Sequence, residues 1–235
     1  MYSLCAVFAH PDDETFSVAG TLARYADQGV EITLVTATSG ESGEMVGTPV
    51  RGSNLVEVRE HELRQAAEIL RINHLQLLRL PDGRLSDQSD KVRLAILETL
   101  RKLRPLVVIT EDIQGITGHP DHIAVTRATV RAVDELGDAG PLKLYEHVIP
   151  LSTASEGLFG TPDDYITTVL DVESWRPQVL AAFLAHRSQV SDSLLERFRG
   201  FARPWLNHFV CVRSRVPILI PEDDLFEGVP ANPRP

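Results

Sequence analysis

The sequence predicts an α/β fold in a single domain, built on a mostly parallel, twisted sheet with helices on both faces. Apolar, β-branched segments typical of strands alternate along the chain with segments whose apolar residues recur at helical spacing. Strand segments such as PLVVITED, residues 105–112, are largely apolar, as in strands covered on both faces. The 235 residues show no internal repeat or linker, which favours one domain over residues 1–235.

The first elements follow from local patterns. Residues 4–9 form an apolar, strand-like run, and residues 14–28 show helical spacing that ends at Gly29. Residues 30–38, VEITLVTAT, are rich in β-branched side chains and predict a second strand. Residues 39–54 contain four glycines and little apolar content, so we expect a long loop that is functional or mobile.

The middle of the chain repeats the alternation. A helix is expected at residues 55–70, followed by a short strand, LQLL, at residues 75–78. PDGRLSD, residues 81–87, has the composition of a turn. Residues 91–103 then show helical spacing and lead into the apolar strand at residues 105–112.

The last third begins with a helix that Pro120 can open, because proline suits the first helical position. We expect this helix to reach about residue 136. The later strands are expected at residues 142–150, 165–172 and 208–213, and the later helices at residues 175–186 and shortly after. The tail, residues 215–235, is rich in proline and acidic residues, so we expect it to wrap the surface or a neighbouring subunit.

Composition excludes several classes of partner. The net charge of −10 disfavours nucleic acid and anionic membrane surfaces. No apolar run approaches the roughly 18 residues of a membrane-spanning helix, and the N-terminus lacks the basic region of a signal peptide. Cys5 and Cys211 each lie in an apolar, strand-like run, which favours two buried free thiols in a reducing compartment. We therefore expect a cytoplasmic protein.

Two similar polar clusters follow two of the predicted strands. HPDD, which contains His10, Asp12 and Asp13, comes directly after the first strand, and GHPDH, residues 118–122, follows the strand at residues 105–112. Ligands of open parallel sheets bind beyond the carboxyl ends of the strands. The clusters lack the glycine-rich turn of a dinucleotide site, and their carboxylates would repel phosphates. A cation site fits them better.

Each cluster also has a simpler explanation. Aspartate caps helix N-termini and proline opens helices, so either cluster alone could be a helix start. Both together, at the ends of separate strands of one sheet, favour a metal site. Catalytic zinc takes nitrogen and oxygen from three protein ligands plus water. His10 and Asp13, and likewise His119 and His122, are three residues apart, so each pair can face one point.

Further motifs extend the pattern. They are AHPDDE (9–14), TSGESGE (38–44), VREHELRQAAEIL (58–70), PDGRL (81–85), GHPDH (118–122) and AHRSQ (185–189). With these motifs, which run over about four-fifths of the chain, the sequence resembles the LmbE-like or PIG-L family of zinc-dependent N-deacetylases. The resemblance implies a Rossmann-like fold and hydrolysis of the N-acetyl group of an N-acetylglucosamine conjugate.

The resemblance also implies a site. It assigns one zinc ion per chain to His10, Asp13 and His122, with Asp12 as the catalytic base. His119, if protonated, can stabilise the oxyanion and protonate the departing amine, and Asp121 could orient His119.

Three substrate-binding candidates come from the other motifs. Arg59 could bind sugar hydroxyls or an anionic aglycone, or be a solvated surface arginine. His186 could approach the metal site or only cap a helix end. Glu41, in TSGESGE, is the third candidate. Asp82, in PDG, fits an ordinary turn, and Glu14 is expected to serve the helix N-terminus rather than the metal.

Alternative functions stay open at this stage. They are a metal-dependent hydrolase of another amide or ester bond on a small molecule, and a non-catalytic sugar-binding module. The sequence also leaves the aglycone open among a malate-like group of a low-molecular-weight thiol, an inositol, a lipid and a chitobiose-like sugar. The partner is expected to be a small-molecule amino-sugar conjugate, and the resemblance implies a homo-oligomer.

Overall fold

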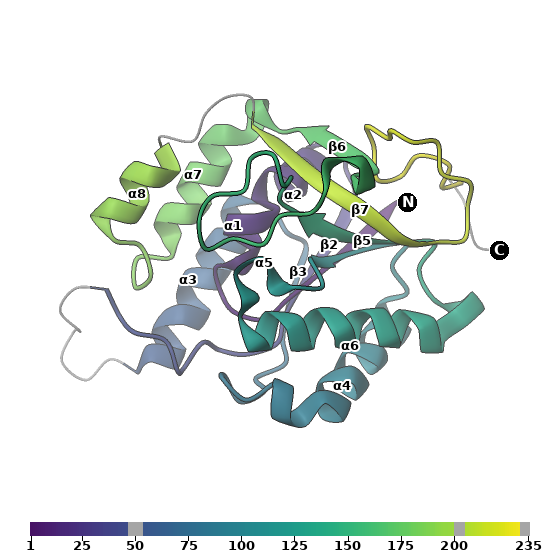
Figure 1. The fold of residues 1–235 in the computed structure, drawn as a ribbon. Helices are drawn as coiled ribbons and strands as arrows, with labels where there is room; N and C mark the ends of the chain where they lie inside the picture. Colours follow the sequence, from purple (N-terminus) through teal and green to yellow (C-terminus); the bar gives the residue numbers. More distant parts are fainter. Residues whose placement is uncertain (47–53, 200–204, 231–235) are drawn as a thin grey trace.

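One sheet of seven strands runs through the described residues, in the order β3-β2-β1-β4-β5-β7-β6 (Figure 1). A computed structural model describes residues 1–46, 54–199 and 205–230. The strands are β1 (Ser3–Phe8), β2 (Glu31–Thr36), β3 (His74–Leu77), β4 (Val107–Glu111), β5 (Lys143–Val148), β6 (Thr168–Asp171) and β7 (Leu206–Ser214). Strands β1 to β5 pair in parallel, and β7 is antiparallel to β5 and β6. The predicted mostly parallel sheet is confirmed.

The helices fall between these strands largely as expected. They are α1 (Asp13–Ser17), α2 (Ala19–Asp27), α3 (Leu55–Ile69), α4 (Ser89–Leu103), α5 (Gly115–Gly118), α6 (Pro120–Leu136), α7 (Arg176–Ala185) and α8 (Asp192–Arg199). The single helix expected at residues 14–28 is wrong in one respect. Val18, at φ −134° and ψ 14°, leaves the helical region and divides it into α1 and α2.

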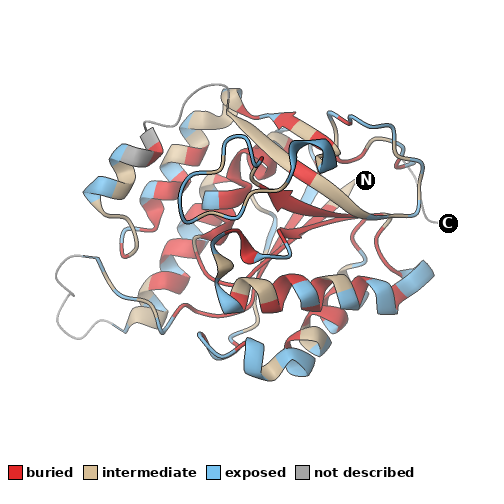
Figure 2. Cartoon of the chain, viewed as in Figure 1, coloured by how far each residue is buried: buried red, intermediate tan, exposed pale blue. Residues whose placement is uncertain are grey.

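Alternate residues of the strands face opposite layers of helices, because successive side chains of a strand point to opposite faces. Leu4, Ala6 and Phe8 of β1 pack in one buried cluster with residues of α2, α3 and α7. Cys5 and Val7 pack in a second cluster with residues of α4 and α6. Figure 2 shows the resulting pattern, with buried strands in the middle and helices that are buried on one side and exposed on the other. Helices thus cover both faces of the sheet, as predicted.

The C-terminal tail does not lie only on the surface. Glu222 is buried beside β5, where its carboxylate accepts a hydrogen bond from Tyr145 at 2.7 Å and pairs with the fully buried Lys143. Leu225 and Phe226 then join the core cluster of α2 and α7. This stretch of the tail therefore packs into the core, since a buried lysine requires a partner charge and the tail supplies it. The expectation that the tail wraps the surface or a neighbouring subunit stays a prediction.

Three other expectations from the sequence can be compared with the structure. Both cysteines are free, but only Cys5 is buried, whereas Cys211 is half-buried. Within the described ranges, no helix is both long and apolar enough to cross a membrane. The long loop expected at residues 39–54 lies partly outside the described residues, which stop at 46 and resume at 54.

Candidate active site

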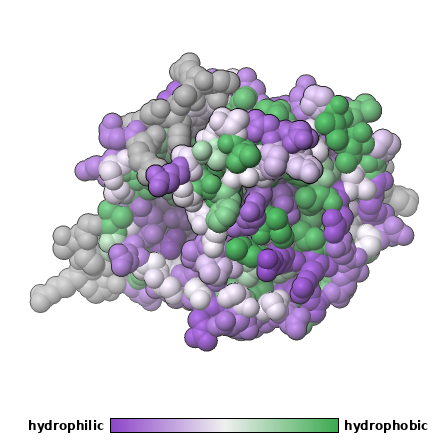
Figure 3. All heavy atoms as spheres, viewed as in Figure 1, coloured by the Kyte–Doolittle hydropathy of each residue, from purple (hydrophilic) through white to green (hydrophobic). Residues whose placement is uncertain are grey.

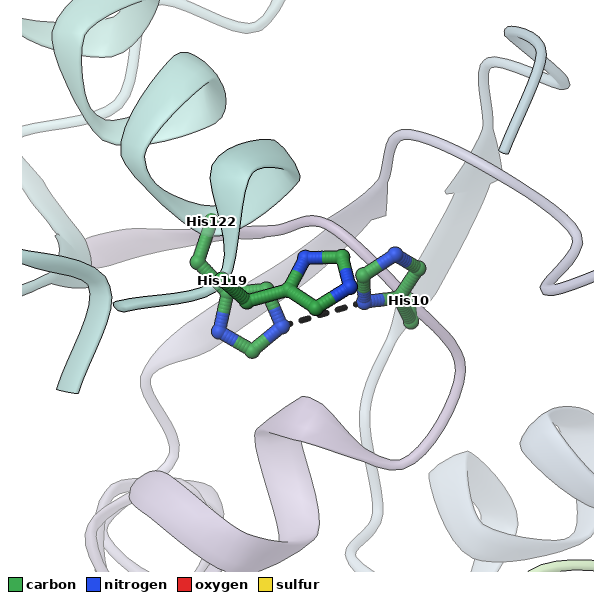
Figure 4. A group of neighbouring side chains, drawn as sticks. All are labelled: His10, His119 and His122. Carbon is green, nitrogen blue, oxygen red and sulfur yellow. Dashed lines mark hydrogen bonds between the residues drawn. The ribbon is translucent and has the colours of Figure 1, made fainter. Parts of the chain in front are cut away.

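The two polar clusters meet because their strands are neighbours. β1 and β4 pair in parallel, so both end at the same edge of the sheet, and the segments that follow them deliver His10 and the start of α6 to one place. Figure 4 shows the rings of His10, His119 and His122 converging there. Nδ1 of His10 lies 3.0 Å from Nε2 of His122, and the three ring centroids are 4.9–5.0 Å apart.

Asp13 completes a group of three donors. Its Oδ2 lies 3.5 Å from Nδ1 of His10, and its Oδ1 lies 3.4 Å from Nε2 of His122. Zinc–ligand bonds of about 2.0–2.1 Å in a tetrahedron place neighbouring ligand atoms about 3.3 Å apart. The three observed separations are close to that spacing. His119 is an alternative third donor, because its ring nitrogen also lies within 4.8 Å of those of His10 and His122.

The outer nitrogens of both histidines face carboxylates. Nε2 of His10 lies 2.9 Å from Asp82 and 3.5 Å from Asp121. Nδ1 of His122 lies 2.6 Å from Glu111. A carboxylate partner places the N–H of a neutral imidazole on the outer nitrogen. The inner nitrogens then face each other with lone pairs, which is unfavourable unless a cation or proton lies between them. The donor set therefore fits a metal ion.

The local charges agree with a cation-binding role. Burial lowers the pKa of His10, but the carboxylates of Asp121, Asp13 and Asp82 outweigh this effect and raise it to about 12. The pKa of His122 is likewise lowered by burial but raised overall, to about 9, by Asp13 and Glu111. Burial raises the pKa of Asp13, whereas the two histidines lower it below its usual range. The carboxylates around His10 and His122 thus favour a positive charge between these residues.

Asp12 occupies the turn between β1 and α1 without joining the donor group. Its φ of 105° lies in the left-handed region, which is uncommon for residues other than glycine. Its carboxylate lies 3.2 Å from the guanidinium of Arg59. Burial and the Asp13 carboxylate raise the pKa of Asp12 to about 7, against the lowering effect of Arg59 and His186. A carboxylate with such a pKa is suited to accept a proton near neutral pH.

His119 is the N-cap of α6, and its surroundings favour a different protonation state from the one expected. Its Nδ1 accepts a hydrogen bond of 3.2 Å from the backbone N–H of Asp121, which leaves the proton of a neutral ring on Nε2. Burial, together with His10 and His122, lowers the pKa of His119. The side chain is exposed at the edge of the site. The geometry favours a neutral hydrogen-bond donor over the protonated acid inferred from the sequence.

Asp121 also acts on a different partner from the one expected. Its carboxylate accepts backbone N–H groups of Gly83 at 2.7 Å and Leu85 at 3.0 Å, and faces His10. The interpretation that Asp121 orients His119 is therefore wrong for the side chain. The reason is that the Asp121 carboxylate is fully buried against the backbone of Gly83 and Leu85, whereas the His119 side chain is exposed at the edge of the site.

Comparison with known proteins identifies the family. The model of the family described as PIG-L: GlcNAc-PI de-N-acetylase matches residues 5–133. The chain belongs to the PIG-L family. This confirms the family predicted from the sequence.

Relatives match most of the length of this PIG-L chain. A 1D-myo-inositol 2-acetamido-2-deoxy-alpha-D-glucopyranoside deacetylase 2 from Saccharopolyspora erythraea is 36% identical, over 95% of this chain and 99% of the relative. A deacetylase of the same description from Acidothermus cellulolyticus is 34% identical, over 80% of each. Among solved structures, a conserved protein from Thermus thermophilus has a TM-score of 0.70 and 29% identity, over 93% of this chain and 97% of that one.

Two of the predicted substrate-binding residues of the PIG-L chain are hydrogen-bonded to the protein. Arg59 is buried, and its guanidinium donates to the carbonyls of Gly40 at 3.0 Å and Pro11 at 2.6 Å. This close approach requires glycine at position 40, because a Cβ there would lie 2.2 Å from Nη1 of Arg59. Glu41 accepts the backbone N–H of Asp82 at 2.9 Å. Arg59 is buried and Glu41 is exposed, and both hold segments that line the site through hydrogen bonds to the backbone.

His186 combines both interpretations that the sequence allowed. It is the C-cap of α7, and its Nε2 lies 2.8 Å from Oε1 of Glu14, the residue after Asp13. Both side chains are buried. Glu14 also accepts the backbone N–H of Asp12 at 3.1 Å, so it serves the start of α1, as expected. His186 thus approaches the site through Glu14 rather than through direct contact with a substrate.

The site opens into a cavity of about 240 Å³. Its lining residues are His10, Asp12, Ser42, Gly43, Arg59, Asp82, Gly83 and His119. Figure 3 shows a hollow with hydrophilic atoms on this side of the PIG-L chain, next to hydrophobic atoms over α5 and the segment between β5 and β6. The cavity suits a small polar ligand, and Asp12 and His119 both face it.

Sequence reasoning missed three residues of this region. Asp82 and Glu111 contact the outer nitrogens of the two histidines, and Phe159 packs against Gly118, where a Cβ would lie 2.8 Å from its ring. Glu111 had a signal, since a carboxylate at the end of an apolar strand points to the functional edge. Asp82 lies in PDG, a sequence typical of a turn, so a role beside His10 was not predicted. Phe159 gave no signal, because it is far from Gly118 along the chain.

Proposed function

We propose that this protein removes the N-acetyl group from an N-acetylglucosamine conjugate, using one zinc ion held by His10, Asp13 and His122. The observation that carries the proposal is the convergence of two imidazole nitrogens and one carboxylate, with the free carboxylate of Asp12 beside them. This donor set, with nitrogen and oxygen ligands only, is typical of catalytic zinc. The class of enzyme, a deacetylase that hydrolyses an acetamide bond, agrees with the family and with the relatives.

The relatives suggest which conjugate to test first. Those from Saccharopolyspora erythraea and Acidothermus cellulolyticus are named for a glucosamine-type sugar joined to myo-inositol. We infer that the aglycone of this substrate is a cyclitol such as inositol. The polar cavity lining, with Ser42, Arg59 and Asp82, supports a hydroxyl-rich ligand.

The residues of the chain have separable tasks in this reaction. When bound, zinc would lower the pKa of a coordinated water and polarise the acetamide carbonyl. Asp12 accepts the proton of the attacking water and can return it to the departing amine. His119 donates a hydrogen bond from Nε2 to the oxygen that develops negative charge, without itself changing protonation state. Asp82, Asp121 and Glu111 fix the rings of His10 and His122 through their outer nitrogens.

The proposal is tested by measuring acetate release from a panel of N-acetylglucosamine conjugates that carry inositol, malate, a lipid or a second sugar. The purified protein is assayed as isolated, after treatment with a chelator, and after zinc is added back. We expect acetate from the inositol conjugate, loss of activity with the chelator, and recovery with zinc. Acetate from the malate conjugate alone would correct the aglycone. No acetate from any conjugate by a zinc-loaded protein would contradict the proposed function.

A further inference from the structure

His186 connects the C-terminal part of the chain to the catalytic turn. It lies outside the residues that match the family model, 5–133, yet its side chain is 1% exposed and contacts Glu14. A carboxylate oxygen only accepts hydrogen bonds, so Nε2 of His186 is the donor. The hydroxyl of Thr15 donates to the same oxygen at 2.7 Å. Glu14 is therefore held in place by two donors in a fully buried position.

The other oxygen of Glu14 fixes the backbone of Asp12. Oε2 accepts the N–H of Asp12 at 3.1 Å, while the carbonyl of Asp12 accepts the N–H of Thr15 at 2.8 Å and begins α1. These bonds surround a residue whose φ of 105° is unfavourable on its own. Because φ sets the direction of the Cα–Cβ bond, the same bonds decide where the carboxylate of Asp12 points.

The segment around His186 has its own anchors. Ser188 donates from its backbone N–H to Glu62 at 2.8 Å and from its hydroxyl to the other oxygen of Glu62 at 2.7 Å. The carbonyl of Ser188 accepts the N–H of Val46 at 2.7 Å. We therefore expect the backbone at His186 to stay in place when its side chain is changed. A substitution at His186 removes the hydrogen bond to Glu14 and the charge interaction that lowers the pKa of Asp12.

We propose that His186 is a positioning residue for the deacetylation: by donating to Glu14, it holds the carboxylate that fixes the Asp12 peptide in its strained turn. The inference rests on the proposed function to the extent that Asp12 is the base. His186 contributes through Glu14 and does not contact the substrate.

Three variants test the inference. His186→Met keeps a similar volume and loses the donor, His186→Gln returns an amide donor, and His208→Gln on β7 is a control away from the cavity. For each we would measure kcat, KM, zinc content and hydrogen exchange of the Asp12 amide. We expect His186→Met to lower kcat by about 10–100-fold, as for small displacements of a catalytic group, with KM and zinc unchanged. His186→Gln should recover most of this loss.

Hydrogen exchange separates this inference from the proposed function. The Asp12 amide should exchange faster in His186→Met than in the wild type, His186→Gln or His208→Gln, even if none of the tested conjugates is a substrate. Should His186→Met fold poorly, Glu14→Gln breaks the same chain of hydrogen bonds and should lower kcat similarly. Combined with His186→Met, it should add little further loss. Wild-type exchange at Asp12 together with wild-type kcat in His186→Met would overturn the inference.

Discussion

Oε2 of Glu111 lies 2.6 Å from Nδ1 of His122. Glu111 is the buried last residue of β4. Its carboxylate contacts Nδ1 of His122, whereas His10 faces the other ring nitrogen, Nε2. Its other oxygen accepts the hydroxyl of Ser17 at 3.2 Å. This contact fixes the orientation of the ring whose Nε2 faces Asp13 and His10. The contact thereby directs Nε2 of His122 toward the donor group.

Glu111→Gln should weaken metal binding by about 10–100-fold, the usual cost of losing a carboxylate behind a ligating histidine. The amide keeps the shape of the side chain but removes its charge, so the ring of His122 becomes a weaker ligand. Competition with a chelating dye would measure the zinc dissociation constant. Glu135→Gln, an exposed carboxylate that pairs with Arg93 away from the cavity, is the matched control. Equal affinities in wild type and Glu111→Gln would mean that His122 is not a ligand or needs no such partner.

His122→Ala should lose the metal, whereas His119→Ala should keep it. The prediction follows from the outer contacts, because His122 has a carboxylate on its far nitrogen and His119 has only a backbone N–H. Elemental analysis of both purified variants beside the wild type gives the answer. A metal-free His119→Ala and a metal-loaded His122→Ala would exchange the roles of the two histidines. If both variants lack the metal, the His10, His119 and His122 group is the better assignment.

Asp12→Asn should keep its metal and lose about 10²–10⁴-fold in kcat, which is the usual contribution of a general base. The amide preserves the size of the side chain and can still contact Arg59, but it cannot accept a proton. Steady-state rates of acetate release, normalised to zinc content, measure the effect. Asp87→Asn, an exposed aspartate paired with Arg84, controls for loss of a carboxylate elsewhere. A rate within a few-fold of the wild type would show that Asp12 only shapes the turn.

Glu146 should make the stability of the protein depend on pH. Burial and the nearby Asp112 raise the pKa of Glu146 to about 7, against lowering by the N–H of Ile113 and by Arg213. An ordinary glutamate in the unfolded chain titrates near 4.3. The folded state therefore binds the proton more tightly, so this contribution to stability is present below about pH 4 and is lost as the pH rises through about 7.

The variant that tests this is Glu146→Gln, which resembles the protonated side chain and keeps an acceptor for Ile113. It should raise the free energy of unfolding at pH 8 by up to about 3 kcal/mol and change it little at pH 4. Urea denaturation at a series of pH values provides the measurement. The same difference between wild type and variant at every pH would show that Glu146 titrates normally.

The sequence alone was sufficient for the sheet and for the place of the site. Apolar runs that end in His10 and before GHPDH put polar residues at strand ends, and parallel strands bring those ends to one edge. Spacing was also informative where partners are local, as for the helix that Pro120 opens. Motif order then predicted the family, which the comparison confirmed. The ligand and base assignments remain predictions of the same kind.

Tertiary structure decided which side chains face one another. Spacing along a helix gives the side of a residue but not the partner that packs against it, so Asp121 could be placed near His119 while its carboxylate in fact meets His10. The Glu14–His186 contact joins residues 172 positions apart and exists only because α7 packs against α1 and α3. Such contacts depend on how whole elements dock, and docking is fixed by the summed burial of apolar surface rather than by any local pattern.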